Sequence, residues 1–211
     1  MSSQRLPGKM LAPLAGRPAI EWVLERLAHA QGVEKIVVAT SVASSDDPVE
    51  EYCRRRDLAV HRGSLEDVAE RLLGAAEAAG LDAFARVNGD SPLLDQRLVD
   101  RGVELMRASE ADLVTNVRPR TFPPGESVEV VRTDALAAVV GTDRTQEERE
   151  HVTGPLYEGD FRVLRFEAPD PRTDVSYTLD TPEDHARLDA ILRAMERPHW
   201  EYSWEEVLEL P

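Results

Sequence analysis

The chain has 211 residues, 42% of them hydrophobic and 31% charged, which are the proportions of an ordinary globular enzyme. Its formal net charge of −15 repels the nucleic-acid backbone and anionic membrane surfaces, so we expect neither as a partner. No apolar run approaches the roughly 20 residues of a membrane helix, and residues 1–10 lack the apolar core of a secretory signal. We therefore expect a cytoplasmic protein with one domain over residues 1–211.

Strand and helix patterns alternate along the chain. In chain order they predict a helix over 18–29, a strand over 36–40, a helix starting within 64–67, a strand over 84–87, a helix over 96–106, strands over 112–117, 128–132 and 162–166, and a helix over 181–195. Such alternation predicts an α/β fold with a mostly parallel central sheet flanked by helices.

The chain opens directly in a loop, residues 2–8. In a parallel nucleotide-binding sheet such a loop normally follows a first strand, and no strand pattern precedes it here. We therefore expect the first strand to be missing. Either the natural start lies upstream of Met1, or another segment or a partner chain takes the place of the strand. The aromatic tail at Trp200, Tyr202 and Trp204 is one candidate, although we expect it to pack on the core of its own domain.

The opening loop also carries two cations, Arg5 and Lys9, together with Gly8 and small hydroxyl residues. Backbone N–H groups and cations in such a loop can hold a triphosphate. The spacing differs from that of a Walker motif, so a solvated basic terminus is an equal alternative.

Two carboxylates stand where a metal could bind. Asp90 follows a predicted strand, with Gly89 beside it allowing close approach, and the alternative is an ordinary turn. Helix capping explains residues 181–184 but leaves Asp180 unexplained. Brought together, Asp90 and Asp180 would suit Mg²⁺, which takes few protein carboxylates and completes its shell with phosphate oxygens and water.

Two further groups of residues are weaker candidates for binding a nucleotide or a substrate. Arg62 and Ser64 could contact a nucleotide, or they form a turn and a helix cap. Arg149 and His151 lie in a charged run that could bind a substrate, although such a run is more often a solvated helix face.

Taken in order, these motifs resemble the SpsF-like cytidylyltransferases and the related CMP-acylneuraminate and CMP-Kdo synthetases. The segments that carry the resemblance are MSSQRLPGK (1–9), VVATS (37–41), DD (46–47), RGSLEDV (62–68), NGDSPLLD (88–95), TNVRPRTFPPGESVEVV (115–131), EREHVT (148–153) and LDTPED (179–184). The first strand of the family and its Ala-Arg pair are absent, and Ser127 stands where the family often has Asp.

The resemblance implies a GT-A-like nucleotidyltransferase fold, similar to the Rossmann fold. It implies that CMP is transferred from CTP, with Mg²⁺, to an acidic sugar-like acceptor in cell-surface polysaccharide synthesis, by a possible homodimer. The implied catalytic residues are Arg5, Lys9, Asp90 and Asp180, with the two aspartates as metal ligands. The implied nucleotide-binding residues are Ser3, Arg5, Gly8, Lys9, Thr40, Ser41, Arg62, Ser64 and Gly89. The weaker acceptor candidates are Glu129, Arg149 and His151.

Two alternatives stay open. A GT-A glycosyltransferase would normally carry a D-x-D metal motif, and neither Asp82 nor Asp112 has a matching partner two residues away. A catalytically silent scaffold domain would agree with the unusual start, but it has no use for a retained Lys9, Asp90 and Asp180. The acceptor itself, whether a nonulosonic acid, another keto-acid sugar or a phosphonate, is not specified by these motifs.

Overall fold

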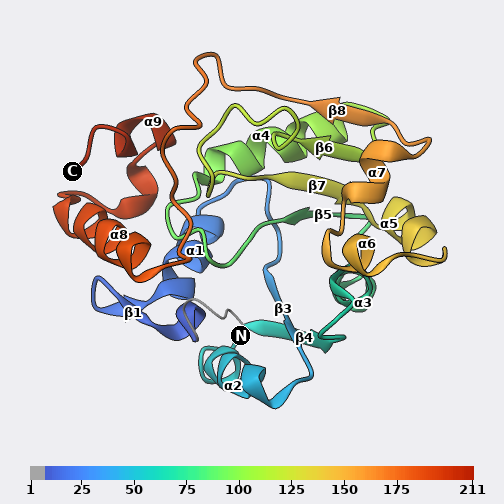
Figure 1. The fold of residues 1–211 in the computed structure, drawn as a ribbon, viewed down its shortest axis with the longest axis horizontal. Helices are drawn as coiled ribbons and strands as arrows, with labels where there is room; N and C mark the ends of the chain where they lie inside the picture. Colours follow the sequence, from blue (N-terminus) through green and yellow to red (C-terminus); the bar gives the residue numbers. More distant parts are fainter. Residues whose placement is uncertain (1–7) are drawn as a thin grey trace.

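The computed structural model describes residues 8–211 (Figure 1). Its α-helices are α1 (Ala19–Ala28), α2 (Asp47–Arg55), α3 (Val68–Ala79), α4 (Gln96–Arg107), α5 (Thr133–Val140), α6 (Gln146–Glu150), α7 (Gly154–Glu158), α8 (Pro182–Ala194) and α9 (Trp204–Val207). Its strands are β1 (Pro13–Leu14), β2 (Arg17–Pro18), β3 (Val37–Ser41), β4 (Ala59–Gly63), β5 (Ala83–Arg86), β6 (Leu113–Thr115), β7 (Glu129–Arg132) and β8 (Val163–Arg165). Short 3₁₀ turns are η1 (Lys9–Leu11), η2 (Ser44–Asp46) and η3 (His199–Glu201).

The largest sheet has the strand order β5-β7-β6-β8. Strand β7 pairs antiparallel with both β5 and β6, whereas β6 and β8 are parallel. Three of the four strands therefore run in one direction and only β7 is reversed, which confirms the prediction of a mostly parallel sheet. Strands β3 and β4 form a separate parallel pair.

Helices cover both faces of the four-stranded sheet. Val114 and Val130 pack into a core shared with α1 and α4. Leu113 and Val131, which point the other way because side chains alternate along a strand, pack into a core shared with α3, α5 and α7. The fold is therefore a three-layer α/β arrangement with helices flanking a central sheet, as predicted.

A third core joins the two ends of the described chain. It contains Leu14 of β1, Trp22 of α1, and Leu188 of α8. The β1–β2 hairpin beside it turns through Ala15 and Gly16 at φ 48° and 85°, two positive values as in the type I′ turn of a two-residue hairpin. Figure 1 shows α8, in red, next to this hairpin.

The aromatic tail packs on the core of its own domain, as expected. Trp204 is 5% exposed and meets Phe122 edge to face at 5.3 Å. Tyr202 is buried in the third core, and Trp200 stacks on His29 at 4.2 Å.

The predicted strands and helices all form, with ends shifted by up to a few residues. The helix predicted to start within 64–67 begins at Val68, with Asp67 as its N-cap accepting from Glu70 N at 2.9 Å. Strand β4 and the β1–β2 hairpin were not predicted. Within residues 8–211 no helix combines the length and apolar character needed to cross a membrane.

Candidate active site

Three charged side chains from distant parts of the chain meet at one point. Lys9 lies in η1, Asp90 in the turn after β5, and Asp180 directly before α8. The Lys9 Nζ atom donates to Asp90 Oδ2 at 2.7 Å and to Asp180 Oδ1 at 2.9 Å. Their side chains are 15%, 23% and 34% exposed, so the cluster is open to a solute.

Backbone contacts set the two carboxylates side by side. Leu179 N donates to Asp90 O at 2.8 Å, which ties the segment before α8 to the turn after β5. Helix α8 starts with a capping box in which the Thr181 and Asp184 side chains each accept from the backbone of the other. The predicted cap at Thr181 is confirmed, and Asp180 lies outside it with its carboxylate turned to Lys9.

The pair of carboxylates keeps Lys9 charged. Burial lowers the pKa of the Lys9 ammonium, but the hydrogen bonds and charges of Asp90 and Asp180 outweigh it and raise that pKa above its usual value. The site therefore holds one cation between two anions.

The chemistry of this cluster suits a divalent cation that arrives with a phosphate ligand. In the described part of the chain, no three His, Cys, Asp or Glu side chains gather as a metal-binding group. Mg²⁺ needs only one or two carboxylates and takes its other ligands from phosphates and water. Asp90 and Asp180 fit that donor set.

The loop around the cluster is tightly built. Gly8 adopts φ 73° at the start of η1, in the left-handed region that favours glycine. Gly89 lies directly under the Met10 side chain, and a Cβ atom at position 89 would overlap the end of that side chain. Gly8 thus supplies a left-handed backbone conformation next to Lys9, and Gly89 leaves room for the Met10 side chain.

The predicted nucleotide residues of β3 gather around a buried carboxylate. Thr40 Oγ1 and Ser41 Oγ donate to Asp46 Oδ2 at 2.8 Å and 2.7 Å, and Ser41 N donates to the same oxygen at 2.9 Å. Asp46 is 4% exposed. Asp46 was not among the predicted site residues, although its place in the DD segment after a strand was an available signal.

Arg62 and Ser64 lie beside this group, at the carboxyl end of β4. Arg62 donates from Nε to Ser41 O at 2.8 Å and from Nη2 to Ala43 O at 2.9 Å, and it forms an ion pair with Glu50 at 2.5 Å. Ser64 Oγ accepts from Asp67 N at 3.0 Å. These contacts hold together the segments at the carboxyl ends of β3 and β4.

Glu129 lies in β7 and is 3% exposed. Its Oε2 accepts from Arg86 at 2.6 Å, and its Oε1 accepts from Thr153 Oγ1 and from Tyr157 OH, both at 2.7 Å. Burial, with the charge of Glu129, raises the pKa of Tyr157. Both oxygens of this predicted acceptor residue thus have protein partners.

Arg149 and His151 lie at the exposed end of α6. Arg149 Nε donates to Arg144 O at 3.2 Å, and its guanidinium is 3.9 Å from Asp67. Arg144 itself forms a buried bidentate pair with Asp67 at 3.0 Å and 2.7 Å. The structure does not bring Arg149 or His151 into the Lys9 cluster. The predicted residues Ser3 and Arg5 lie outside the described residues.

Comparison with known proteins identifies the family. The family model described as Cytidylyltransferase matches residues 1–196. The spore coat polysaccharide biosynthesis protein SpsF of Bacillus subtilis is 31% identical over 212 residues, which cover 94% of this chain and 85% of that protein.

Two solved structures agree with this fold. A cytidylyltransferase from Leptospira borgpetersenii is 29% identical, with a TM-score of 0.93 over 99% of this chain and 89% of that one. A CMP:2-keto-3-deoxy-manno-octonic acid synthetase in complex with CTP shares the fold, with a TM-score of 0.69 at 20% identity over 91% of this chain and 94% of that one. The chain is therefore a nucleotidyltransferase enzyme and belongs to the cytidylyltransferase family.

Proposed function

We propose that this protein transfers CMP from CTP to an acidic sugar-like acceptor and releases pyrophosphate, with Mg²⁺ as cofactor. The observation that carries the proposal is the contact of Lys9 with both Asp90 and Asp180. A cation and a metal-binding carboxylate pair in one partly open site are what a triphosphate substrate needs. The similarity to SpsF favours an acceptor used in cell-surface polysaccharide synthesis.

The reaction forms a bond between an acceptor oxygen and the α-phosphorus of CTP and breaks the bond from that phosphorus to the bridging oxygen of pyrophosphate. Negative charge grows on the phosphate oxygens as the leaving group departs, and the Lys9 ammonium is placed to offset it. Asp90 and Asp180 would hold Mg²⁺, which supplies further charge neutralisation when bound. Such a reaction depends on positioning and electrostatics more than on covalent help from the protein.

The remaining residues keep the roles expected from the resemblance. The edge of β3 and β4, with Thr40, Ser41, Arg62 and Ser64, is proposed for the base and ribose. Ser3, Arg5, Gly8 and Gly89 are proposed around the phosphates. The proposed acceptor residues are Glu129, Arg149 and His151.

The proposal is tested by measuring pyrophosphate release from CTP, ATP, GTP and UTP with Mg²⁺, over a panel of acidic sugars, together with thermal shifts in each nucleotide. We expect CTP to raise the Tm most, because binding to the native state alone stabilises it, and to be the nucleotide that is cleaved. Equal shifts with all four nucleotides would contradict the proposal. Binding of CTP without turnover of any acceptor would favour the silent scaffold, and transfer from a nucleotide-sugar would favour a glycosyltransferase.

A further inference from the structure

A row of polar side chains crosses the largest sheet at one edge. Arg86 of β5 is the register partner of Glu129 of β7, and Glu129 is also the partner of Thr115 of β6. Thr115 is in turn the partner of Arg165 of β8. Register partners project from the same face, so these four side chains lie side by side. The row lies at the carboxyl ends of the parallel strands β5, β6 and β8, the edge where α/β sheets bind ligands, and Asp90 follows soon after β5.

Three exposed arginines lie at the β6–β8 end of this row: Arg118, Arg120 and Arg165. We call them the arginine group. Arg165 Nε donates to Arg118 O at 2.9 Å, which joins the end of β8 to the loop after β6. Arg120 Nη1 donates to Ser127 Oγ at 3.0 Å. Ser127 lies two residues before Glu129, in the segment that leads into β7. The three arginines are therefore attached to adjacent parts of one sheet edge.

The arginine group keeps its positive charge without a counter-ion from the described chain. None of its members forms an ion pair with a carboxylate of residues 8–211. Carboxylates are plentiful, with 40 Asp and Glu residues against 25 Lys and Arg. Exposed arginines elsewhere use them: Arg162 lies 3.0 Å from Asp112 and Arg193 lies 2.5 Å from Asp189. Neighbouring cations repel one another, so their grouping in such an acidic chain favours an anionic ligand.

The polar row supports the arginine group from below. The Arg118 guanidinium lies 4.7 Å from the centre of the Tyr157 ring. The Tyr157 hydroxyl is itself fixed, because it donates to Glu129 Oε1 at 2.7 Å and lies 2.7 Å from Thr115 Oγ1. A cation–π contact holds a guanidinium in place and uses none of its N–H donors as hydrogen bonds. Among residues 8–211 those donors of Arg118 have no hydrogen-bond acceptor, so they are available to an anion.

We propose that the arginine group binds a carboxylate or phosphate group of the acceptor. This inference rests on the proposed function and adds where the acceptor lies, which is along the polar row from the Lys9 cluster beside β5 toward β8. Arg165 is three strand spacings from Arg86, or ~14 Å at ~4.8 Å each. The acidic group is then on the order of 10 Å from the oxygen that attacks CTP. The acceptor class is therefore an extended sugar with an acidic group remote from its reacting hydroxyl.

The first test measures anion binding at the arginines themselves. Inorganic phosphate and malonate are titrated separately while the side-chain Nε–H NMR signals of Arg118 and Arg165 are followed, and the tighter of the two anions identifies the acidic group. We expect Arg118→Gln and Arg165→Gln each to raise the Kd at least about tenfold, the scale of one lost charged hydrogen bond. Arg101→Gln is the matched control, because Arg101 is exposed, lies 5.1 Å from the Phe166 ring and has no carboxylate partner among residues 8–211. It should leave the Kd unchanged.

A second pair of variants keeps every arginine and changes only the charge beside them. Ser127→Asp places a carboxylate where Arg120 now donates to a hydroxyl, and Ser127→Asn is its neutral control. We expect the Asp variant to weaken binding of the tighter anion at least about fivefold, because it supplies the counter-ion within the chain. The Asn variant should bind that anion as the wild type does.

The last measurement links the anion to the acceptor. Acidic sugars should displace phosphate from Arg118 and Arg165, and their neutral counterparts should not. For an acidic sugar that is turned over, Arg118→Gln should raise the acceptor KM at least about tenfold and leave the KM for CTP unchanged.

The NMR titrations use neither CTP nor turnover, so their failure counts against the arginine group alone, whereas absence of CTP turnover counts against the proposed reaction. Equal anion binding in the Arg118→Gln and Arg101→Gln variants would overturn the proposal. So would displacement of phosphate by neutral sugars as effectively as by acidic ones, or an unchanged acceptor KM in Arg118→Gln.

Discussion

The Lys9 ammonium lies between two carboxylates that the sequence separates widely, and this contact organises the site. Asp90 was predictable because it follows a strand and a glycine, and Asp180 because the helix cap beside it left it without a structural purpose. Their meeting with Lys9 was not predictable from spacing, since it depends on how the segment before α8 docks on the turn after β5. Asp46 was missed although its partners Thr40 and Ser41 are close to it in the sequence.

We predict that Asp90→Asn and Asp180→Asn each lower kcat/KM for CTP by at least about 10²-fold, the scale expected when a group that stabilises transition-state charge is lost. The Tm should change by only a few degrees, because both side chains are partly exposed. Asp174→Asn, an exposed carboxylate paired with Arg172, is the matched control. Near-normal turnover in either variant at saturating Mg²⁺ would remove that residue from the metal site.

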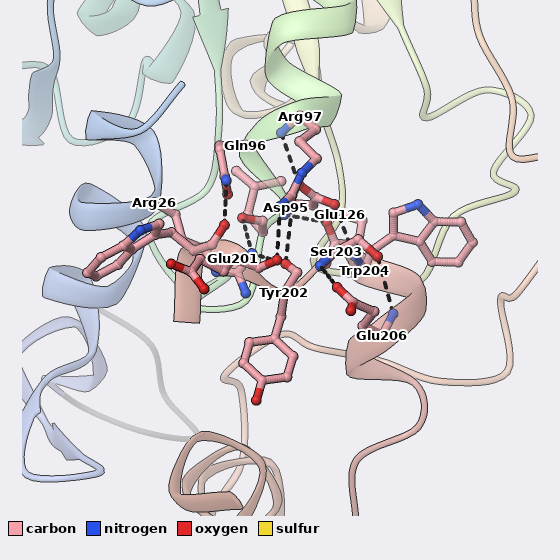
Figure 2. A network of polar contacts seen from close by, with 12 residues as sticks. Arg26, Asp95, Gln96, Arg97, Glu126, Glu201, Tyr202, Ser203, Trp204 and Glu206 are labelled. Atoms are coloured by element: carbon pink, nitrogen blue, oxygen red, sulfur yellow. Dashed lines mark hydrogen bonds and ion pairs between the residues drawn. The ribbon is translucent and has the colours of Figure 1, made fainter. Parts of the chain in front are cut away.

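Glu126 is a buried carboxyl group in the segment between β6 and β7 (Figure 2). Burial raises its pKa to about 8, against a backbone hydrogen bond in which Asp95 N donates to Oε2 at 2.7 Å. The folded protein thus keeps a proton that the unfolded chain releases near its ordinary pKa. Because the folded state binds one more proton than the unfolded state, Glu126 lowers the free energy of unfolding progressively as the pH rises from about 5 to 8.

We therefore predict that Glu126→Gln, which is neutral at every pH, reduces the loss of stability between pH 5 and pH 8. Urea unfolding of both proteins across this range measures the effect. The difference in unfolding free energy between variant and wild type should move in favour of the variant as the pH increases. A difference that stays constant with pH would show that Glu126 does not retain its proton.

Side chains of α1 and of the start of α4, among them one buried guanidinium, hold the carboxyl-terminal segment in place (Figure 2). Arg26 of α1 donates to His199 O at 2.5 Å and to Tyr202 O at 3.2 Å. Asp95, at the start of α4, accepts from Trp204 N at 3.0 Å. Helix α9 has only four residues, so besides its own capping box it depends on contacts with the rest of the molecule, such as the bond from Trp204 N to Asp95.

We predict that Arg26→Ala destabilises the protein by about 2–3 kcal/mol, because it removes charged hydrogen bonds to buried carbonyl groups. Limited proteolysis should then cut first between residues 195 and 204. Arg97→Ala is the control, since Arg97 donates to Glu201 O and Tyr202 O from a half-exposed side chain and should cost less than about 1 kcal/mol. Equal effects of the two substitutions would show that burial of Arg26 adds nothing.

Elements were predictable where the apolar pattern is strong. Helix α8 combines a Thr cap, a first-turn proline and an apolar face, and its predicted start is confirmed. Strand β4, Ala-Val-His-Arg-Gly, has a single β-branched residue and gave no signal. It forms because it pairs residue by residue with β3, which is a tertiary effect.

For the whole molecule, the alternation of strands and helices was enough to predict the α/β class. The reversed direction of β7 could not be predicted. A strand pattern carries no direction, and β7 is placed by its pairing with both β5 and β6. The possible homodimer and the single domain over residues 1–211 stay predictions.

The backbone hydrogen bond from Leu179 N to Asp90 O joins two segments that are far apart in the sequence, so they are synthesised at different times. A ribosome releases Lys9 and Asp90 early, but Asp180 follows only after most of the chain has been made. At about 5–20 residues per second, the delay between the two aspartates is on the order of ten seconds. During that time the nascent chain has one carboxylate of the pair and cannot form the contact of Lys9 with both aspartates.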